Sequence, residues 1–126
     1  MSGALVMGSL RLLVVEDHVD TAELLASLLQ RRGHRVEIAT TAGEALRLAS
    51  TMSFDVIISD LRLPDASGYE LMKQLRATSP VKGIAMSGWS RDEDLVRSRE
   101  VGFSAHLTKP VHVHQLEQAI RRVAAE

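Results

Sequence analysis

The chain has 126 residues, a formal net charge of −1 from 15 basic and 16 acidic residues, and no cysteine. This length fits one domain, and the lack of cysteine excludes disulfides and thiolate metal sites. No apolar run approaches the roughly 18 residues of a membrane-spanning helix. No long block of like charge is present, which argues against contact with nucleic acid or a membrane surface.

The first third of the chain predicts a strand, a helix and a second strand after a short leader. Residues 1–9 are expected to lie outside the fold, as a flexible leader, a stub of a preceding linker or added non-native residues. Leu10–Val15 is typical of a buried strand. Asp20–Glu23 has the form of a capping box, which predicts the start of a helix that ends at a left-handed Gly33. One face of this helix would place four leucines in the core: Leu24, Leu25, Leu28 and Leu29.

The middle of the chain repeats the alternation of strand and helix. Arg35–Ala39 alternates apolar and polar residues as a strand does, and Thr41–Glu44 is a second capping box. Phe54–Ser59 is the most apolar strand candidate. The proline-containing segment Leu61–Ser67 is typical of a loop, and a helical pattern begins near Gly68.

The last third completes the pattern. Gly83–Met86 predicts a fourth strand, and Ser90–Glu93 is a third capping box that opens a polar helix ending at Gly102. Ala105–Thr108 predicts the fifth strand. The last helix directs four apolar residues inward: Val113, Leu116, Ile120 and Val123. Strand–helix pairs with short right-handed connections predict an α/β fold with a parallel sheet and helices on both faces.

Four of the predicted strands end in residues suited to phosphoryl chemistry. Glu16–Asp17 follow the first strand, Asp60 the third, Ser87 the fourth and Lys109 the fifth. The carboxyl ends of parallel strands meet at one edge of the sheet, where open α/β sheets bind ligands. We therefore expect these side chains to converge although they are far apart in sequence.

The residue types that converge define the chemistry. Glu16, Asp17 and Asp60 offer the hard oxygen ligands that Mg²⁺ prefers beside a phosphate oxygen. An aspartate carboxylate can act as a nucleophile and form an acyl phosphate. Lys109 supplies a mobile positive charge for phosphate oxygens, and Ser87 supplies a hydroxyl donor.

At these residues the chain resembles the receiver domain of two-component response regulators. The resemblance runs from Leu10 to about Ala125 and rests on an ordered set of motifs: Glu16-Asp17, Asp60 followed by Pro64 and Gly68, Ser87-Gly88, and Lys109-Pro110. It implies a flavodoxin-like (βα)5 fold, strand order 2-1-3-4-5, in one domain spanning residues 10–126.

The resemblance also implies a cytoplasmic phosphorelay module. Asp60 would take a phosphoryl group from the phosphohistidine of a histidine kinase or histidine phosphotransfer domain. Such a module is not a conventional enzyme, because it catalyses only its own phosphorylation and dephosphorylation. No contact of this domain with nucleic acid or membrane is expected.

Individual roles follow from the same resemblance. Asp17, Asp60 and the backbone carbonyl of Arg62 would ligate Mg²⁺, and Glu16 would act largely through ordered water. Lys109 would contact the phosphoryl oxygens. Ser87 would swing toward them and carry the signal to a face formed by the helix ending near Val101, the last strand and the last helix. That face could also form a homodimer.

One position departs from the family pattern. His106 stands where the family usually has Tyr or Phe, whose ring moves inward as the hydroxyl residue swings. An imidazole is smaller than that ring and is titratable, which does not favour a tyrosine-like switch. We assign Ser87 and His106 to the switch. His106 looks more like receivers fused to histidine kinases, which favours a hybrid sensor histidine kinase as the parent. A stand-alone regulator and a transcription-factor receiver are the alternatives.

Other polar side chains near the site have simpler interpretations. Arg62 and Trp89 lie two residues after Asp60 and Ser87, and our hypothesis is that both overhang the acyl phosphate and set water access. The remaining histidines are expected to be solvent-facing and not metal ligands: His18, His34, His112 and His114.

Three other functions stay open as alternatives. A flavodoxin-like cofactor binder is disfavoured because the loop Asp17–Asp20 has no glycine and two aspartates, and no G-x-G-x-x-G follows any strand. A phosphatase of the haloacid-dehalogenase type would need an acid where Arg62 stands. A non-phosphorylated interaction module ranks low, because every site position holds a competent residue.

Overall fold

Strands and helices alternate through the part of the chain that the computed structural model describes, residues 9–88 and 91–126. The elements in chain order are β1 (Arg11–Val15), α2 (Val19–Arg31), β2 (Arg35–Ala39), α3 (Ala42–Thr51), β3 (Val56–Asp60), α4 (Gly68–Thr78), β4 (Lys82–Ser87), α5 (Asp92–Val101), β5 (Phe103–Thr108) and α6 (Val113–Ala124). The strands are parallel in the order β2-β1-β3-β4-β5, which confirms the predicted fold. Of the expected leader, residues 1–8 lie outside the described residues.

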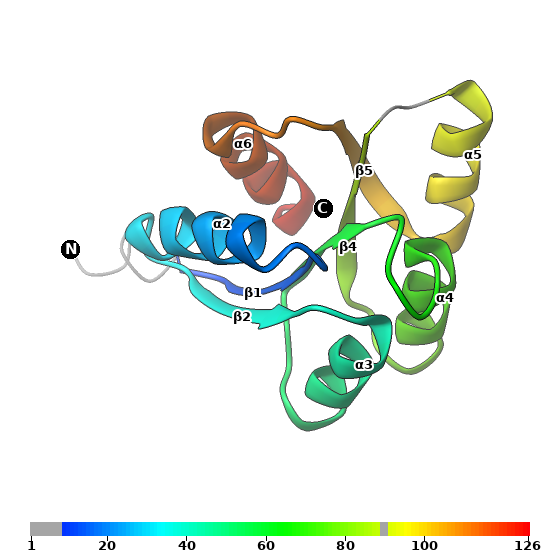
Figure 1. Cartoon of the computed structure of the whole chain (residues 1–126), viewed down its shortest axis with the longest axis horizontal. Helices are drawn as coiled ribbons and strands as arrows, with labels where there is room; N and C mark the ends of the chain where they lie inside the picture. The colour runs from blue at the N-terminus through cyan, green and yellow to red at the C-terminus, as the bar shows by residue number, and fades with distance from the viewer. Residues whose placement is uncertain (1–8, 89–90) are drawn as a thin grey trace.

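Two separate apolar cores lie on the two faces of the sheet. Helices α2 and α6 cover one face, and α3, α4 and α5 cover the other (Figure 1). Side chains alternate along a strand, so Leu12 and Val14 of β1 enter the first core, while Leu13 and Val15 enter the second. A strand buried on both faces has to be apolar throughout, which explains the continuous apolar runs of β1 and β3.

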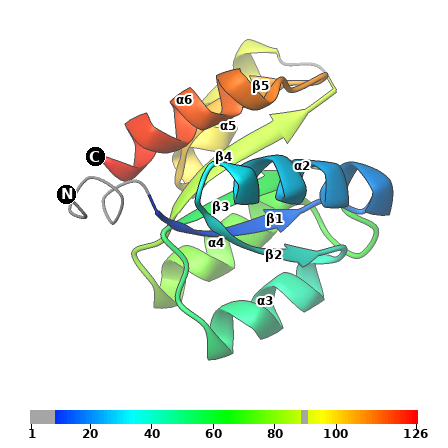
Figure 2. The same ribbon diagram turned by 90° about the vertical axis from the view of Figure 1, so that its left-hand side faces the viewer.

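The register brings the carboxyl ends of the central strands to one edge of the sheet. Val15 of β1 lies opposite Ser59 of β3, Asp60 lies opposite Met86, and Ser87 lies opposite Thr108 of β5. Figure 2 shows the strands running side by side between the two helix layers. The residues that follow these strands are therefore neighbours. Among the described residues, no helix is long and apolar enough to cross a membrane.

Two of the three predicted helix starts need correction. Helix α2 begins at Val19, and its N-cap is His18, whose Nδ1 accepts the backbone N–H of Thr21 at 3.3 Å; the capping box at Asp20 is wrong. The reason is local: the Glu16 carboxylate accepts the His18 N–H at 3.0 Å, which starts the turn early.

Helix α5 likewise begins at Asp92, with Arg91 as its N-cap, while Ser90 lies outside the described residues. The Asp94 carboxylate accepts the Arg91 N–H at 3.1 Å. The predicted start at Thr41 is confirmed for α3, where the Thr41 hydroxyl accepts the Glu44 N–H at 3.0 Å. The left-handed conformation predicted for Gly33 is confirmed, with φ of 96°, and Gly102 ends α5 as predicted, with φ of 115°.

Two burial predictions are wrong. His34 is buried, not solvent-facing: its Nδ1 accepts the Leu10 N–H at 3.2 Å, and its Nε2 lies 2.9 Å from the carboxylate of Glu117 on α6. A buried imidazole needs such partners, and Glu117 is 83 residues away in sequence. Leu24 is 60% exposed, because α2 turns this residue away from the sheet that buries Leu25 and Leu29.

Gly68 permits the close approach of α4 to the strand that carries Asp60. A Cβ at Gly68 would press against the carbonyl oxygen of Asp60 and lie 2.9 Å from the Cα of Leu61. Backbone atoms at this point cannot move aside, because the Gly68 N–H donates to the Leu61 carbonyl and the Leu61 N–H donates to the Met86 carbonyl. The helix therefore sits against β3 only if residue 68 has no side chain.

We expect Gly68→Ala to lower the free energy of unfolding by about 1–3 kcal/mol, because the added methyl group overpacks rigid backbone. Urea denaturation measures the change. Gly43→Ala is the matched control: it is also in the first turn of a helix, but its Cβ would make only an ordinary 3.4 Å contact with Asp65. Equal stabilities of the two variants would contradict the close approach.

Candidate functional site

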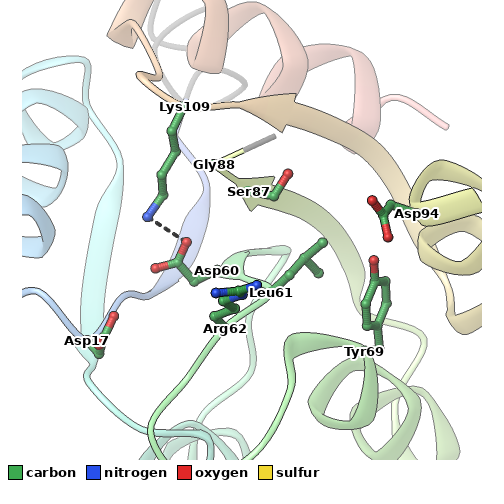
Figure 3. Close-up of a pocket in the computed structure, with 9 residues that line it drawn as sticks. All are labelled: Asp17, Asp60, Leu61, Arg62, Tyr69, Ser87, Gly88, Asp94 and Lys109. Carbon is green, nitrogen blue, oxygen red and sulfur yellow. Dashed lines mark ion pairs between the residues drawn. The ribbon is translucent and has the colours of Figure 1, made fainter. Parts of the chain in front are cut away.

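The residues predicted from the strand ends meet in one pocket. Glu16 directly follows β1, Asp60 ends β3, Ser87 ends β4 and Lys109 directly follows β5. The pocket has a volume of about 590 Å³ (Figure 3), and its lining residues are Asp17, Asp60, Leu61, Arg62, Tyr69, Ser87, Gly88, Asp94 and Lys109. Glu16 lies just beneath it, buried to 1% exposure.

The ammonium group of Lys109 bridges two buried carboxylates. Its Nζ lies 2.6 Å from Asp60 Oδ1 and 2.9 Å from Glu16 Oε1. Asp60 is only 5% exposed, so both carboxylates have lost most of their hydration. Buried carboxylates require such pairing, because an isolated charge in a low-dielectric interior is costly. Two carboxylates share one ammonium group, so with both acids ionised the site carries an excess negative charge.

The surroundings of the two acids shift their pKa values in opposite directions. Burial, and then the hydrogen bond with Glu16, raise the pKa of Asp60 from 3.8 to about 7. Burial alone would also raise the pKa of Glu16, but its hydrogen bonds with Asp60, Lys109 and the His18 N–H outweigh burial and lower it. The pKa of Lys109 is raised, because its two carboxylate partners outweigh the opposing effect of burial. A proton is therefore retained on Asp60 close to neutral pH.

A third carboxylate adjoins this pair. Asp17 is exposed, and one carboxylate oxygen from each of Glu16, Asp17 and Asp60 lies within 4.8 Å of the others. All-oxygen donors with excess negative charge suit a hard divalent cation, which would also replace the proton held by Asp60. The acidic cluster therefore fits a metal ion.

The Ser87 side chain contacts a residue of the neighbouring strand. Its Oγ lies 2.8 Å from Nε2 of His106 on β5. Figure 3 shows the Ser87 hydroxyl pointing away from Asp60, although both residues line the pocket. The two residues assigned to a switch are thus in direct contact.

Of the two residues expected to control the access of water, the structure describes only one. Arg62 lines the pocket and its side chain is exposed, whereas Trp89 lies outside the described residues. Sequence reasoning missed Tyr69 and Asp94, which form the far wall of the pocket. It also missed Asp65, which accepts the N–H groups of Ala42 and Gly43 at 2.8 and 2.9 Å and so ties the loop after Asp60 to α3. Nothing in the sequence around Asp65 indicates that its carboxylate accepts a backbone N–H from a helix 22 residues earlier.

We expect Asp60→Asn to change how stability depends on pH in metal-free buffer. Because the folded pKa of Asp60 is raised, its contribution to the wild-type free energy of unfolding falls as the pH rises from about 4 to about 7. The neutral amide removes this fall, so the variant should be more stable at pH 8 by about 1–3 kcal/mol. Urea titrations in the presence of a chelator measure both profiles. Asp55→Asn, an exposed position, serves as control, and parallel profiles for Asp60→Asn and wild type would contradict the assignment.

Comparison with known proteins identifies the family. The family model of the response regulator receiver domain matches residues 12–121. An uncharacterized 14.6 kDa protein in the sodA1 3′ region of Leptolyngbya boryana is 31% identical over 119 residues, which cover 92% of this chain and 91% of that protein. The virulence sensor protein BvgS of Bordetella bronchiseptica is 34% identical over 125 residues, which cover 93% of this chain but only 10% of BvgS.

A solved structure agrees with these relatives. The response regulator receiver domain protein (CheY-like) of Methanospirillum hungatei JF-1 superposes with a TM-score of 0.86 at 31% identity, over 91% of this chain and 93% of that chain. Fold, site geometry and family model therefore agree. The chain belongs to the response regulator receiver domain family of two-component signal transduction.

Proposed function

We propose that this receiver domain accepts a phosphoryl group on Asp60 from the phosphohistidine of a histidine kinase or histidine phosphotransfer domain, with Mg²⁺ as cofactor. The observation that carries the proposal is the Lys109 ammonium, held 2.6 Å from Asp60 and 2.9 Å from Glu16 beside the exposed Asp17. A nucleophile, a positive charge and a set of oxygen ligands then lie within one pocket.

The transfer would proceed by displacement at phosphorus. An ionised oxygen of Asp60 attacks, a P–O bond forms, and the P–N bond to the donor imidazole breaks. Lys109 exchanges its contact with the Asp60 carboxylate for the phosphoryl oxygens, while Glu16 keeps the ammonium in place. Charge on the transferring group is what such a site has to stabilise.

Mg²⁺ would be held by Asp17, Asp60 and the backbone carbonyl of Arg62, with Glu16 acting through ordered water. When bound, the ion neutralises charge on the phosphoryl oxygens and favours the ionised form of Asp60. Arg62 and Trp89 would limit the access of water to the acyl phosphate. A cytoplasmic location belongs to the same proposal.

We expect the chain to take up one phosphoryl group from acetyl phosphate when Mg²⁺ is present and none when it is chelated. Asp60→Asn should abolish the adduct, and Lys109→Ala should slow its formation about 10–100-fold, because the positive charge is lost where negative charge develops. Intact-mass spectrometry over time measures the adduct. Asp55→Asn is the control and should react at the wild-type rate. An adduct that persists in Asp60→Asn would contradict the assignment.

The hollow beside α2 suits the donor protein. It extends from Glu16, Asp17 and Lys109 to an apolar wall that includes Leu24 and Val111. Leu24 and the neighbouring Val19 are 60% and 54% exposed, and large apolar side chains that remain in solvent beside a reactive site mark an interaction surface. We place the helix that carries the donor histidine on this hollow.

The proposal also covers the class of protein to which the domain belongs and a dimer interface on the face away from α2. A hybrid sensor histidine kinase is favoured by His106, with a stand-alone regulator or a transcription factor as the alternatives. Leu95 and Val96 on α5 are 39% and 56% exposed and line a shallow hollow with Arg99. A homodimer would use this face, formed by α5, β5 and α6.

Leu24→Asp should separate donor docking from chemistry. We expect it to slow phosphotransfer about tenfold or more from whichever purified kinase or phosphotransfer domain is most active on the wild-type chain, because the apolar contact is lost. Phosphorylation by acetyl phosphate should be unchanged. Leu95→Asp on α5 is the matched control and should slow neither reaction. Equal effects of the two variants on phosphotransfer would place the donor elsewhere.

A further inference from the structure

His106 occupies an unusual environment for a histidine. Its Nε2 lies 2.8 Å from the hydroxyl oxygen of Ser87, and its Nδ1 is buried with no hydrogen-bond partner among the described residues. Burial lowers the pKa of His106, which favours the neutral ring. The hydrogen bond to Ser87 is therefore the one polar contact found for this ring in the described part of the chain.

The strand register explains why these two side chains meet. Ala85 on β4 lies opposite His106 on β5, and Ser87 is two residues further along β4. Side chains at i and i+2 share a face of the sheet, so Ser87 and His106 are diagonal neighbours on the face covered by α3, α4 and α5. An imidazole reaches across this diagonal with a nitrogen atom at its tip. A phenylalanine ring would present only carbon there.

The Ser87 hydroxyl also lies beside the pocket that contains Asp60. Ser87 lines the pocket with Asp60 and Lys109, but its hydroxyl points away from Asp60 (Figure 3). A turn of the hydroxyl toward a phosphoryl group on Asp60 breaks its bond with His106, whichever ring nitrogen carries the proton. Nε2 would then lose its contact while the buried Nδ1 still has no partner among the described residues, and a buried polar atom without a partner is unfavourable.

We propose that His106 is a positioning residue for Ser87: it holds the Ser87 hydroxyl against β5 in the unphosphorylated protein, and the phosphoryl group competes with it for that hydroxyl. The inference rests on the proposed phosphorylation of Asp60 and assigns its regulation. The response of β5 is then driven by the loss of a hydrogen bond from a half-buried imidazole, and not by an aromatic ring that fills vacated space. The imidazole gains by turning toward solvent or a new polar partner.

The test is the affinity for beryllofluoride, which mimics a phosphoryl group on aspartate, measured by calorimetry in the presence of Mg²⁺. His106→Phe removes the ring nitrogen that holds the Ser87 hydroxyl, so binding should tighten about fivefold, the equivalent of one ordinary hydrogen bond of about 1 kcal/mol. His106→Gln keeps polar atoms at the end of the side chain and should stay closer to the wild-type value. His114→Phe, at an exposed position on α6, controls for the loss of a histidine.

The Ser87→Ala background distinguishes positioning from a structural role. There His106→Phe should no longer change the affinity; the same change in both backgrounds would overturn the inference. The ring nitrogens of His106 in the wild-type chain provide a measurement without substitution. Their NMR signals should shift on addition of beryllofluoride, and an unchanged Nε2 signal would also overturn it. A wild-type chain that does not bind beryllofluoride at all would overturn the proposed function, and this inference with it.

Discussion

One ammonium group between two buried carboxylates is the constraint on which the rest of the site depends. Lys109 can reach both Glu16 and Asp60 only if the ends of β1, β3 and β5 lie level at one edge of the sheet. Parallel pairing in the observed register meets this condition, and the apolar faces of the strands set that register by burial. Gly68 contributes by letting α4 lie directly against the Asp60 backbone. Stability and chemistry therefore share the same few positions.

The charge in this cluster makes the unligated site receptive. Burial, and then the neighbouring Glu16, raise the pKa of Asp60 to about 7, whereas hydrogen bonds lower the pKa of Glu16. Two carboxylates on one ammonium also leave an excess of negative charge. A cation bound by the three carboxylates would relieve this imbalance. Under the proposed function, Lys109 would then contact a phosphoryl group on Asp60. In the scheme proposed above, activation is a series of partner exchanges. Lys109 leaves the Asp60 carboxylate for phosphoryl oxygens, and Ser87 leaves His106.

The surfaces beside the site differ between the two faces of the sheet. On the α2 and α6 side, the exposed Leu24 extends an apolar hollow up to the reactive groups, which suits a donor protein. On the other side, Ser87 and His106 connect the pocket to β5, beside α5 with its exposed Leu95 and Val96. Receipt of the phosphoryl group and response to it would then use opposite faces of one sheet.

The sequence by itself determined the parallel α/β fold and the convergence of Glu16, Asp17, Asp60, Ser87 and Lys109, because strand periodicity and the residue that ends a strand are local features. Only the tertiary structure decided the rest. The burial of His34 depends on Glu117, 83 residues away, and two N–H groups in the first turn of α3 depend on Asp65 from a distant loop. Leu24 matched the helical pattern of core leucines, but the placement of α2 on the sheet left it in solvent. The bond between Ser87 and His106 arises from the pairing of β4 with β5. Each of these outcomes requires a partner that a linear pattern does not name, since the pattern shows which faces are apolar but not what packs against them.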